Sequence, residues 1–177
     1  MSLRTTGRGD LESIFSVHQQ AFGGAEEARL AMELLADPSA RPVVSILAEE
    51  GDRSVGHVLF TRVRIQPADA VSAAILAPLA VVPDRQGRGI GGELVEAGLN
   101  ELAERGVALA FVLGHPGYYP RFGFEPAGAR GLQPPYPIPE EHAGAWMVRA
   151  FREDILGAVR GRVACADTLD REKYWVE

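Results

Sequence analysis

Four glycines fall within residues 87–92, directly after an apolar segment, and Arg85 and Arg88 stand beside them. Glycine has no Cβ atom, so main-chain N–H groups in such a stretch can approach a bulky ligand closely. A helix that begins near Gly89 would add unpaired N–H donors and the positive end of its dipole. The stretch therefore predicts a seat for a phosphate or pyrophosphate. The alternative is a strand end without a ligand, because glycines and a Val-Pro pair serve there too.

The spacing of the glycines also fits a dinucleotide site, because Gly87, Gly89 and Gly92 satisfy the pattern G-x-G-x-x-G. Such a site needs an acidic residue about 20 positions further on to hold a ribose. Residues 108–112 occupy that distance and carry no carboxylate. A nucleoside-triphosphate loop is excluded as well, since no Gly-Lys-Ser/Thr follows the glycines.

The fuller pattern, Gln86-x-x-Gly89-x-Gly91 after an apolar strand, resembles the acetyl-coenzyme-A (acetyl-CoA) motif of the GNAT superfamily of N-acetyltransferases. Residues 118–124, Tyr-Tyr-Pro-Arg-Phe-Gly-Phe, look like the closing motif of that family, a tyrosine four residues before Gly-Phe. Together with Gly-His-Pro at residues 114–116, this motif is similar to that of the YhbS-like bacterial group. The specific part of the resemblance covers about residues 70–126.

The resemblance implies acetyl-CoA as co-substrate and direct transfer of the acetyl group to a primary amine on a small molecule or peptide. It makes Tyr119 the general acid at the sulfur, and a backbone N–H near Leu79 or Ala80 the donor to the thioester carbonyl. Packing of the tyrosine rings on their aromatic neighbours is the alternative. The residues expected to hold the coenzyme are Leu79, Ala80, Val81, Gln86, Gly87, Arg88, Gly89, Ile90, Gly91 and Gly92.

Removal of a proton from the amine is the harder half of such a reaction. An amine with a pKa near 10.4 is neutral in about one molecule in 10³ at pH 7, which costs about 4 to 5 kcal/mol, whereas protonating a thiolate of pKa near 8.5 is worth about 2 kcal/mol. His115, at the end of a predicted strand, is the candidate base, directly or through water. Glu33 is a weaker candidate, and a His115 that only holds its turn fits the sequence equally well.

The composition indicates one domain, with a core over residues 1–151 and a C-terminal extension over residues 152–177. A chain of 177 residues that is 46% hydrophobic can bury one full core. The lone Cys165 fits a reducing compartment, and the four histidines show no metal-binding spacing, so we expect a cytoplasmic protein without a metal. A net charge of −6 argues against nucleic acid and favours a cationic amine, or only reflects a soluble surface. No apolar run suggests a signal peptide or a membrane span.

The periodicity predicts an α/β (α+β) fold with a mixed central sheet of about six to seven strands and helices on both faces. Helices are expected over residues 11–22, capped by Asp10, and over 26–36, with a third from residue 90 to Gly106. An edge strand near residues 3–6 and a hairpin of 43–49 with 55–65 are expected in the first half. Further strands are predicted over 71–82, 107–113, 145–151 and 161–166, and a short helix over 153–159.

Pro78 interrupts the central strand 71–82, and proline in such a strand marks a bulge. We expect the sheet to splay there and to leave the amides of residues 79–81 free for the pantetheine arm of a coenzyme. The bland alternative is a kink that only improves packing. The proline-rich residues 127–144 predict a long loop near the acceptor site, and Tyr174 and Trp175 either pack the tail down or form a homodimer contact. A catalytically silent acyl-CoA-binding sensor remains an alternative to an enzyme.

Overall fold

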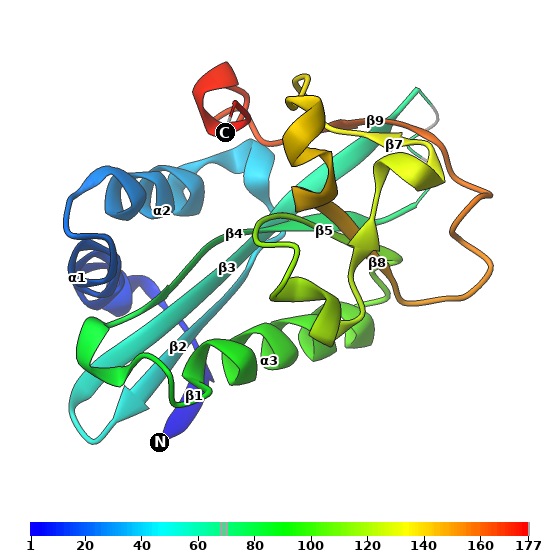
Figure 1. Cartoon of the computed structure of the whole chain (residues 1–177). Coiled ribbons are helices and arrows are strands. Elements are labelled where there is room, and N and C mark those ends of the chain that lie inside the picture. Colours follow the sequence, from blue (N-terminus) through cyan, green and yellow to red (C-terminus); the bar gives the residue numbers. More distant parts are fainter. Residues whose placement is uncertain (68, 70, 177) are drawn as a thin grey trace.

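The computed structural model describes residues 1–67, 69 and 71–176. In this part of the chain, nine strands form one mixed sheet whose main path runs β1-β2-β3-β4-β5-β8-β6 (Figure 1). The β4–β5 and β7–β9 pairs are parallel and the others antiparallel. The strands are β1 (Ser2–Thr5), β2 (Val44–Glu50), β3 (Arg53–Gln66), β4 (Ala73–Val81), β5 (Leu109–Leu113), β6 (Glu125–Pro126), β7 (Leu132–Gln133), β8 (Trp146–Ala150) and β9 (Gly161–Ala164).

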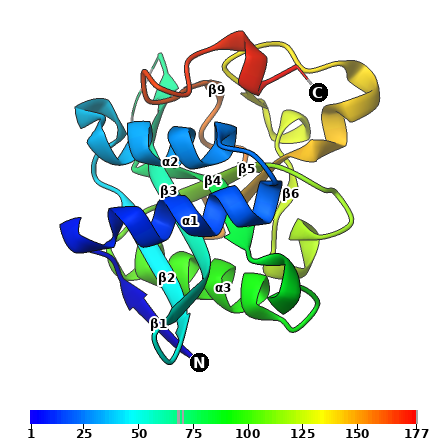
Figure 2. The ribbon, with the colours of Figure 1, turned by 90° about the vertical axis from the view of Figure 1, so that its left-hand side faces the viewer.

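Helices cover both faces of the sheet, as predicted. α1 (Leu11–Phe22) and α2 (Glu26–Ala36) lie side by side on one face, and α3 (Ile90–Glu104) lies on the other (Figures 1 and 2). The apolar stripe predicted for α3 is the buried one: Ile90, Leu94, Val95, Gly98, Leu99 and Leu102. No helix in the described ranges is long and apolar enough to cross a membrane.

The splay predicted at Pro78 is confirmed by the register of β4. Phe60 of β3 pairs with Leu76, but Val58 pairs with Leu79, so Ala77 and Pro78 together stand opposite a single β3 residue. On its other side, β4 pairs with β5 only from Ala73 to Leu76. Beyond this bulge β4 continues along β3 alone, and one of its edges is open.

Three local predictions were wrong or incomplete. Residues 153–159 form turns and one isolated bridge, Leu156 with Val159, because Gly157 adopts a positive φ of 90° that ends any helical turn. The loop 127–144 contains β7, which pairs with β9 despite the nearby prolines. Asp10 precedes α1 but does not cap it with its side chain, since its carboxylate accepts from the Gly7 N–H at 2.7 Å and pairs with Arg4.

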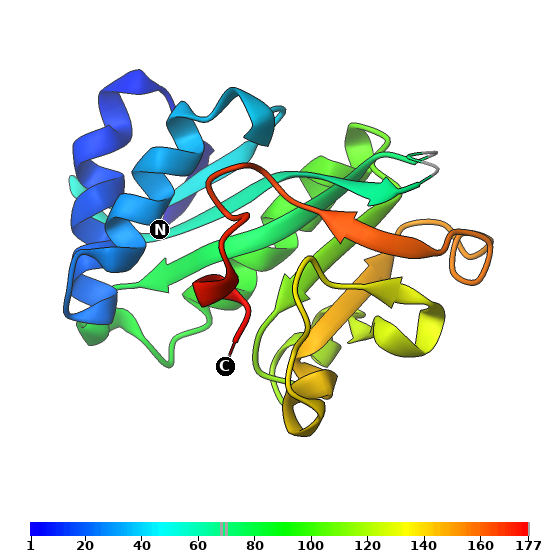
Figure 3. The same ribbon diagram turned by 90° about the horizontal axis from the view of Figure 1, so that it is seen from above.

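The C-terminal segment returns to the sheet. β9 pairs with the end of β3 over Arg64–Gln66 and also with β7, and the view from above shows these strands next to one another (Figure 3). Trp175 is 2% exposed, lies edge-on to Trp146 with centroids 5.7 Å apart, and donates its indole N–H to the carbonyl of Leu169. The prediction that this tryptophan packs the tail down is confirmed.

Candidate active site

The glycine-rich loop joins β4 to α3 with the geometry that its sequence requires. After a 3-10 turn at Pro83–Arg85, Gly87 and Gly89 adopt positive φ angles of 75° and 83°, and α3 begins at Ile90. Residues with a Cβ rarely adopt this conformation, and the space beside both glycines is open. The first N–H groups of α3 are therefore exposed at the positive end of its dipole, where an anion is favoured.

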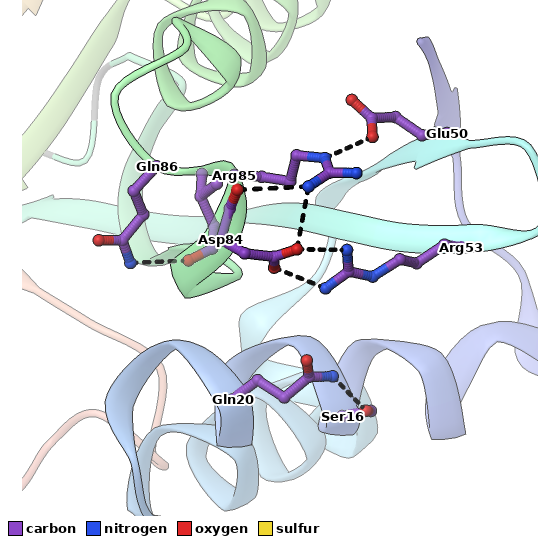
Figure 4. Close-up of polar contacts among 8 residues, drawn as sticks. Ser16, Gln20, Glu50, Arg53, Asp84, Arg85 and Gln86 are labelled. Carbon is purple, nitrogen blue, oxygen red and sulfur yellow. Dashed lines mark hydrogen bonds and ion pairs between the residues drawn. The ribbon is translucent and has the colours of Figure 1, made fainter.

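A frame of ion pairs ties the loop to the neighbouring strands β2 and β3 (Figure 4). Arg53 donates two hydrogen bonds to Asp84, at 2.8 and 2.7 Å, and these bonds lower the pKa of Asp84 to about 2. Arg85 pairs with Glu50 at 2.7 Å and with Asp84 at 2.9 Å, and its hydrogen bond lowers the pKa of Glu50. Arg85 thus braces the loop through two carboxylates instead of standing as a free cation. Arg88 is exposed and does not line the cleft that lies beside this loop.

The loop and a group of aromatic side chains enclose a cleft of about 520 Å³, which we name the loop cleft. A Cβ at Gly91 would lie 3.2 Å from the Tyr118 hydroxyl oxygen, so this glycine allows the close approach of the two walls. Arg121 stacks on Tyr118, with its guanidinium carbon 4.6 Å from the ring centroid. The lining residues are Leu79, Val81, Arg85, Gln86, Gly87, Gly89, Ile90, Gly91, Gly92, Tyr118, Arg121 and Phe122.

Sequence reasoning missed the aromatic wall of this cleft. Tyr118, Arg121 and Phe122 belong to the same Tyr-Tyr-Pro-Arg-Phe motif as the predicted acid Tyr119, but none of them was predicted to lie in the site. The signal was present in the motif itself. A cation two positions before Gly123 can serve the anion that the glycine loop was predicted to attract.

The open edge of β4 faces the loop cleft with two residues, not three. Val82 donates its N–H to Val55 of β3 at 2.9 Å, and groups alternate along a strand, so Ala80 also directs its N–H toward β3. Leu79 and Val81 direct theirs to the side that β5 has left. The carbonyl of Val81 accepts from the Gln86 side chain at 2.9 Å. The expectation that the Ala80 amide would be free is therefore wrong, because it faces its partner His57.

Tyr119 is buried behind Tyr118 and beside the end of β5. It is 8% exposed, and a Cβ at Gly114 would lie 2.4 Å from its ring, so only glycine fits there. The rings of Tyr118 and Phe124 contact it edge-on, with centroids 5.1 and 5.8 Å away. Burial, and then the nearby Tyr118, raise the pKa of Tyr119, so its hydroxyl keeps its proton at neutral pH.

A second cleft, of about 800 Å³, involves α1 and α2, and we name it the helix-side cleft. His115 lines it together with His142, Tyr174 and two carboxylates from the start of α2, Glu26 and Glu27. The ammonium group of Lys173 lies 4.0 Å from Glu26. The predicted weaker base, Glu33, lines a separate hollow with Asp37 and Arg171.

A cavity of about 120 Å³ adjoins the helix-side cleft. It shares Leu30, Leu113 and Tyr174 with the cleft and reaches Leu76 and Ala77, where β4 leaves β5. The loop cleft therefore lies beside Leu79 and Val81, beyond the bulge. The helix-side cleft opens toward Leu76 and Ala77, where β4 leaves β5. Within the described residues, no group of three or more histidine, cysteine, aspartate or glutamate side chains could hold a metal ion.

Comparison with known proteins identifies the class. Residues 2–127 match the acetyltransferase (GNAT) domain, and the chain belongs to this family of acetyltransferases. It is 46% identical over 164 residues to the Escherichia coli K12 protein named "Uncharacterized N-acetyltransferase YjhQ", covering 92% of this chain and 90% of that protein. It is 32% identical over 162 residues to the N-acetyltransferase YhbS of the same strain, covering 92% and 94%. The predicted family and the prediction of an acyltransferase are confirmed.

Two solved structures share the whole architecture. The YhbS crystal structure from Escherichia coli in complex with CoA has a TM-score of 0.86 at 29% identity, covering 96% of this chain and 92% of that one. A GNAT family acetyltransferase from Brucella melitensis in complex with acetyl-CoA has a TM-score of 0.76 at 30% identity, covering 96% and 97%. The fold class predicted from the sequence is confirmed by these likenesses, but the predicted strand number of about six to seven was too low, since the described residues form nine strands.

Proposed function

We propose that the protein transfers an acetyl group directly from acetyl-CoA to a primary amine. The observation that carries this proposal is the open edge of β4, which stands between a loop cleft suited to a pyrophosphate and a helix-side cleft suited to an amine. Coenzyme complexes of the two similar solved structures support the choice of coenzyme.

In this proposal, the pyrophosphate binds the N–H groups of Gly87 to Gly92, with Gln86, Arg88 and Ile90 around it. Arg121 joins these residues because its guanidinium lies on the cleft wall. The pantetheine amides pair with the carbonyl of Leu79 and the N–H of Val81, as an added strand would, and the N–H of Leu79 is left for the thioester. Ala80 keeps Leu79 and Val81 in the strand, but its own N–H is directed toward β3 and not toward the coenzyme.

The reaction begins with a neutral amine in the helix-side cleft. The carboxylates of Glu26 and Glu27 favour a cationic acceptor, whether a small molecule or a peptide. His115 is proposed as the base that takes a proton from this amine, directly or through water. The amine attacks the thioester carbon, the backbone N–H of Leu79 stabilises the oxyanion, and Tyr119 donates its proton to the departing sulfur. The Tyr119 hydroxyl carries a proton at neutral pH, as a donor to the sulfur must.

A catalytically silent acyl-CoA-binding sensor would share the loop cleft but would not need the helix-side cleft. Release of free coenzyme A from acetyl-CoA in the presence of a panel of amines separates the two functions. We place the protein in the cytoplasm, where the lone Cys165 would stay reduced. Burial, as its main cause, raises the pKa of this thiol to about 12, so it is a poor nucleophile.

Thermal unfolding with and without coenzyme tests the first step. A ligand at about 100 times its dissociation constant adds about 2.7 kcal/mol to the native state, so millimolar coenzyme A should raise the melting temperature by several degrees. NAD at the same concentration should leave it unchanged, because residues 108–112 offer no carboxylate for a ribose. A shift with NAD but none with coenzyme A would reverse the assignment.

A further inference from the structure

A chain of buried hydrogen bonds crosses the protein from the end of β1 to α1. The hydroxyls of Thr6 and Ser45 lie 2.7 Å apart, the Ser45 hydroxyl meets Nε2 of His57 at 2.8 Å, and Nδ1 of His57 meets Nε2 of His18 at 2.8 Å. Both imidazoles are fully buried, and Ser45 is 5% exposed. Every link joins groups that can both donate and accept, so the whole chain can reverse its hydrogen-bond direction.

The two ends of the chain differ. At one end, Thr6 and Ser45 line a hollow of about 510 Å³, which Arg8 and Leu11 also line, so water there can exchange protons with the Thr6 hydroxyl. At the other end, Nδ1 of His18 is buried and has no hydrogen-bond partner within the described residues. An unpaired buried nitrogen is costly, and such a group calls for a functional explanation.

The His18 end of the chain lies next to the helix-side cleft. His57 is the cross-strand partner of Ala80, next to the free edge of β4. The His18 ring is parallel to Phe22, with centroids 6.2 Å apart, and Phe22 lines the helix-side cleft. His18 is therefore one ring behind the wall against which the acceptor would bind.

We propose that His18, His57, Ser45 and Thr6 form a proton relay that removes the proton lost by the acceptor amine. This inference rests on the proposed acetyl transfer. Nδ1 of His18 takes, through water, the proton that His115 has removed from the amine, while His18 passes the proton on its Nε2 to Nδ1 of His57. His57 passes the proton on its Nε2 to Ser45, Ser45 passes its own to Thr6, and Thr6 releases one to water in the hollow. One proton enters and one leaves, and no group keeps a net charge.

Neutral rings suit this role. Burial lowers the pKa of His18 to about 4, and burial together with the neighbouring His18 lowers the pKa of His57 well below its usual value. The pair therefore transmits a proton in concert instead of storing it as an imidazolium.

An acceptor-free experiment tests the relay in the full-length protein. ¹⁵N NMR of the histidine rings at pH 7 should show exchange between two tautomers in both His18 and His57. Thr6→Val keeps the shape of the side chain but removes the hydroxyl that would accept from Ser45, so the Ser45 hydroxyl should donate to His57 and both rings should settle with the proton on Nδ1. Thr6→Ser should behave as the wild type. A wild type with one fixed tautomer, unchanged in Thr6→Val, would overturn the relay.

Turnover with an amine from the panel gives the second readout. We expect kcat to fall about 10² in His18→Gln, within the usual range for a lost proton-transfer group, and about tenfold in Thr6→Val, with KM for acetyl-CoA unchanged. Thr6→Ser should retain kcat, and the solvent deuterium isotope effect should shrink in Thr6→Val. Full kcat in both His18→Gln and Thr6→Val would refute the relay. If coenzyme A binds but the wild type acetylates no amine, the proposed function fails. The NMR experiment then still decides whether the chain of hydrogen bonds can reverse its direction.

Discussion

The two clefts at the splayed strand are built in opposite ways. The loop cleft comes mainly from two continuous stretches, residues 79–92 and 118–122, and a frame of surface ion pairs supports it. The helix-side cleft combines side chains from α1, α2, the end of β5, the loop before β8 and the C-terminal tail. A site for a shared coenzyme can be encoded locally, whereas a site for a particular acceptor depends on segments that only folding brings together.

The largest effect is expected when the seat of the pyrophosphate is charged. Gly89→Glu should weaken coenzyme A binding at least about 10³-fold, because a like charge about 4 Å away costs about 4 kcal/mol at an effective dielectric constant of 20. Gly106→Glu is the matched control, since Gly106 has a φ of 80°, stands at the other end of α3 and also has open space beside it. Calorimetric titration measures both variants, and equal losses would show that backbone strain, not charge at the seat, decides binding.

As the pH falls, the first loss in the free energy of unfolding is expected from His18, beside the helix-side cleft. Below pH 6.5 the unfolded chain protonates His18, whereas the folded chain does not until about pH 4, so the free energy of unfolding falls with pH in this window. The loss due to His18 is about 3 kcal/mol, because its pKa falls from 6.5 to about 4 and each tenfold change in proton affinity is worth about 1.36 kcal/mol. Asp84, in the ion-pair frame of the loop, has a pKa lowered to about 2, so its contribution to the free energy of unfolding is lost only between about pH 4 and 2.

Urea titrations at several pH values measure this dependence. His18→Phe should reduce the slope between pH 6.5 and 4, since one buried proton acceptor is gone, and His57 supplies the remainder with the same sign. A slope that is the same in His18→Phe and the wild type would mean that His18 is not kept neutral by burial.

The adjacent tyrosines differ in their access to the loop cleft, because Tyr118 lines it and Tyr119 is buried behind Tyr118. Tyr119→Phe should lower kcat about 10² with little change in KM for acetyl-CoA, and the deficit should shrink above about pH 8.5, where a thiolate leaves unaided. Tyr118→Phe should instead raise KM for acetyl-CoA and keep kcat, because its hydroxyl lies against Gly91 in the loop cleft. Steady-state kinetics across this pH range distinguish the residues, and full activity of Tyr119→Phe would leave its hydroxyl without a catalytic role.

The smallest effect concerns the acceptor. Glu27→Gln should raise KM for a cationic amine about tenfold, the value of about one hydrogen bond to a charged group, and leave coenzyme binding intact. Glu33→Gln, on the same helix but outside the cleft, should change neither constant. If both variants behave alike, the net charge of −6 attracts the amine and the helix-side cleft does not.

Prediction from the sequence was most accurate where one short pattern fixes one local structure. The bounds of α2, the buried face of α3, the hairpin of β2 with β3 and the bulge at Pro78 follow from apolar spacing, turn residues and a missing N–H donor. The short helix expected over residues 153–159 failed, because the weak local preference was overridden by Gly157 and by the return of the chain to β3.

By itself, the sequence determined the family, the fold class and the geometry of the glycine loop that we propose for an anion, because glycines at positive φ and a helix start act within a few residues of one another. The tertiary structure decided that Arg85 is engaged by Glu50 and Asp84 while Arg121 lines the loop cleft, and that Glu26 and Glu27, not Glu33, share a cleft with His115. It also decided that His18 and His57, 39 positions apart, meet at 2.8 Å. Such contacts depend on how helices dock on a sheet, and the periodicity of each element gives its buried face but not its partner.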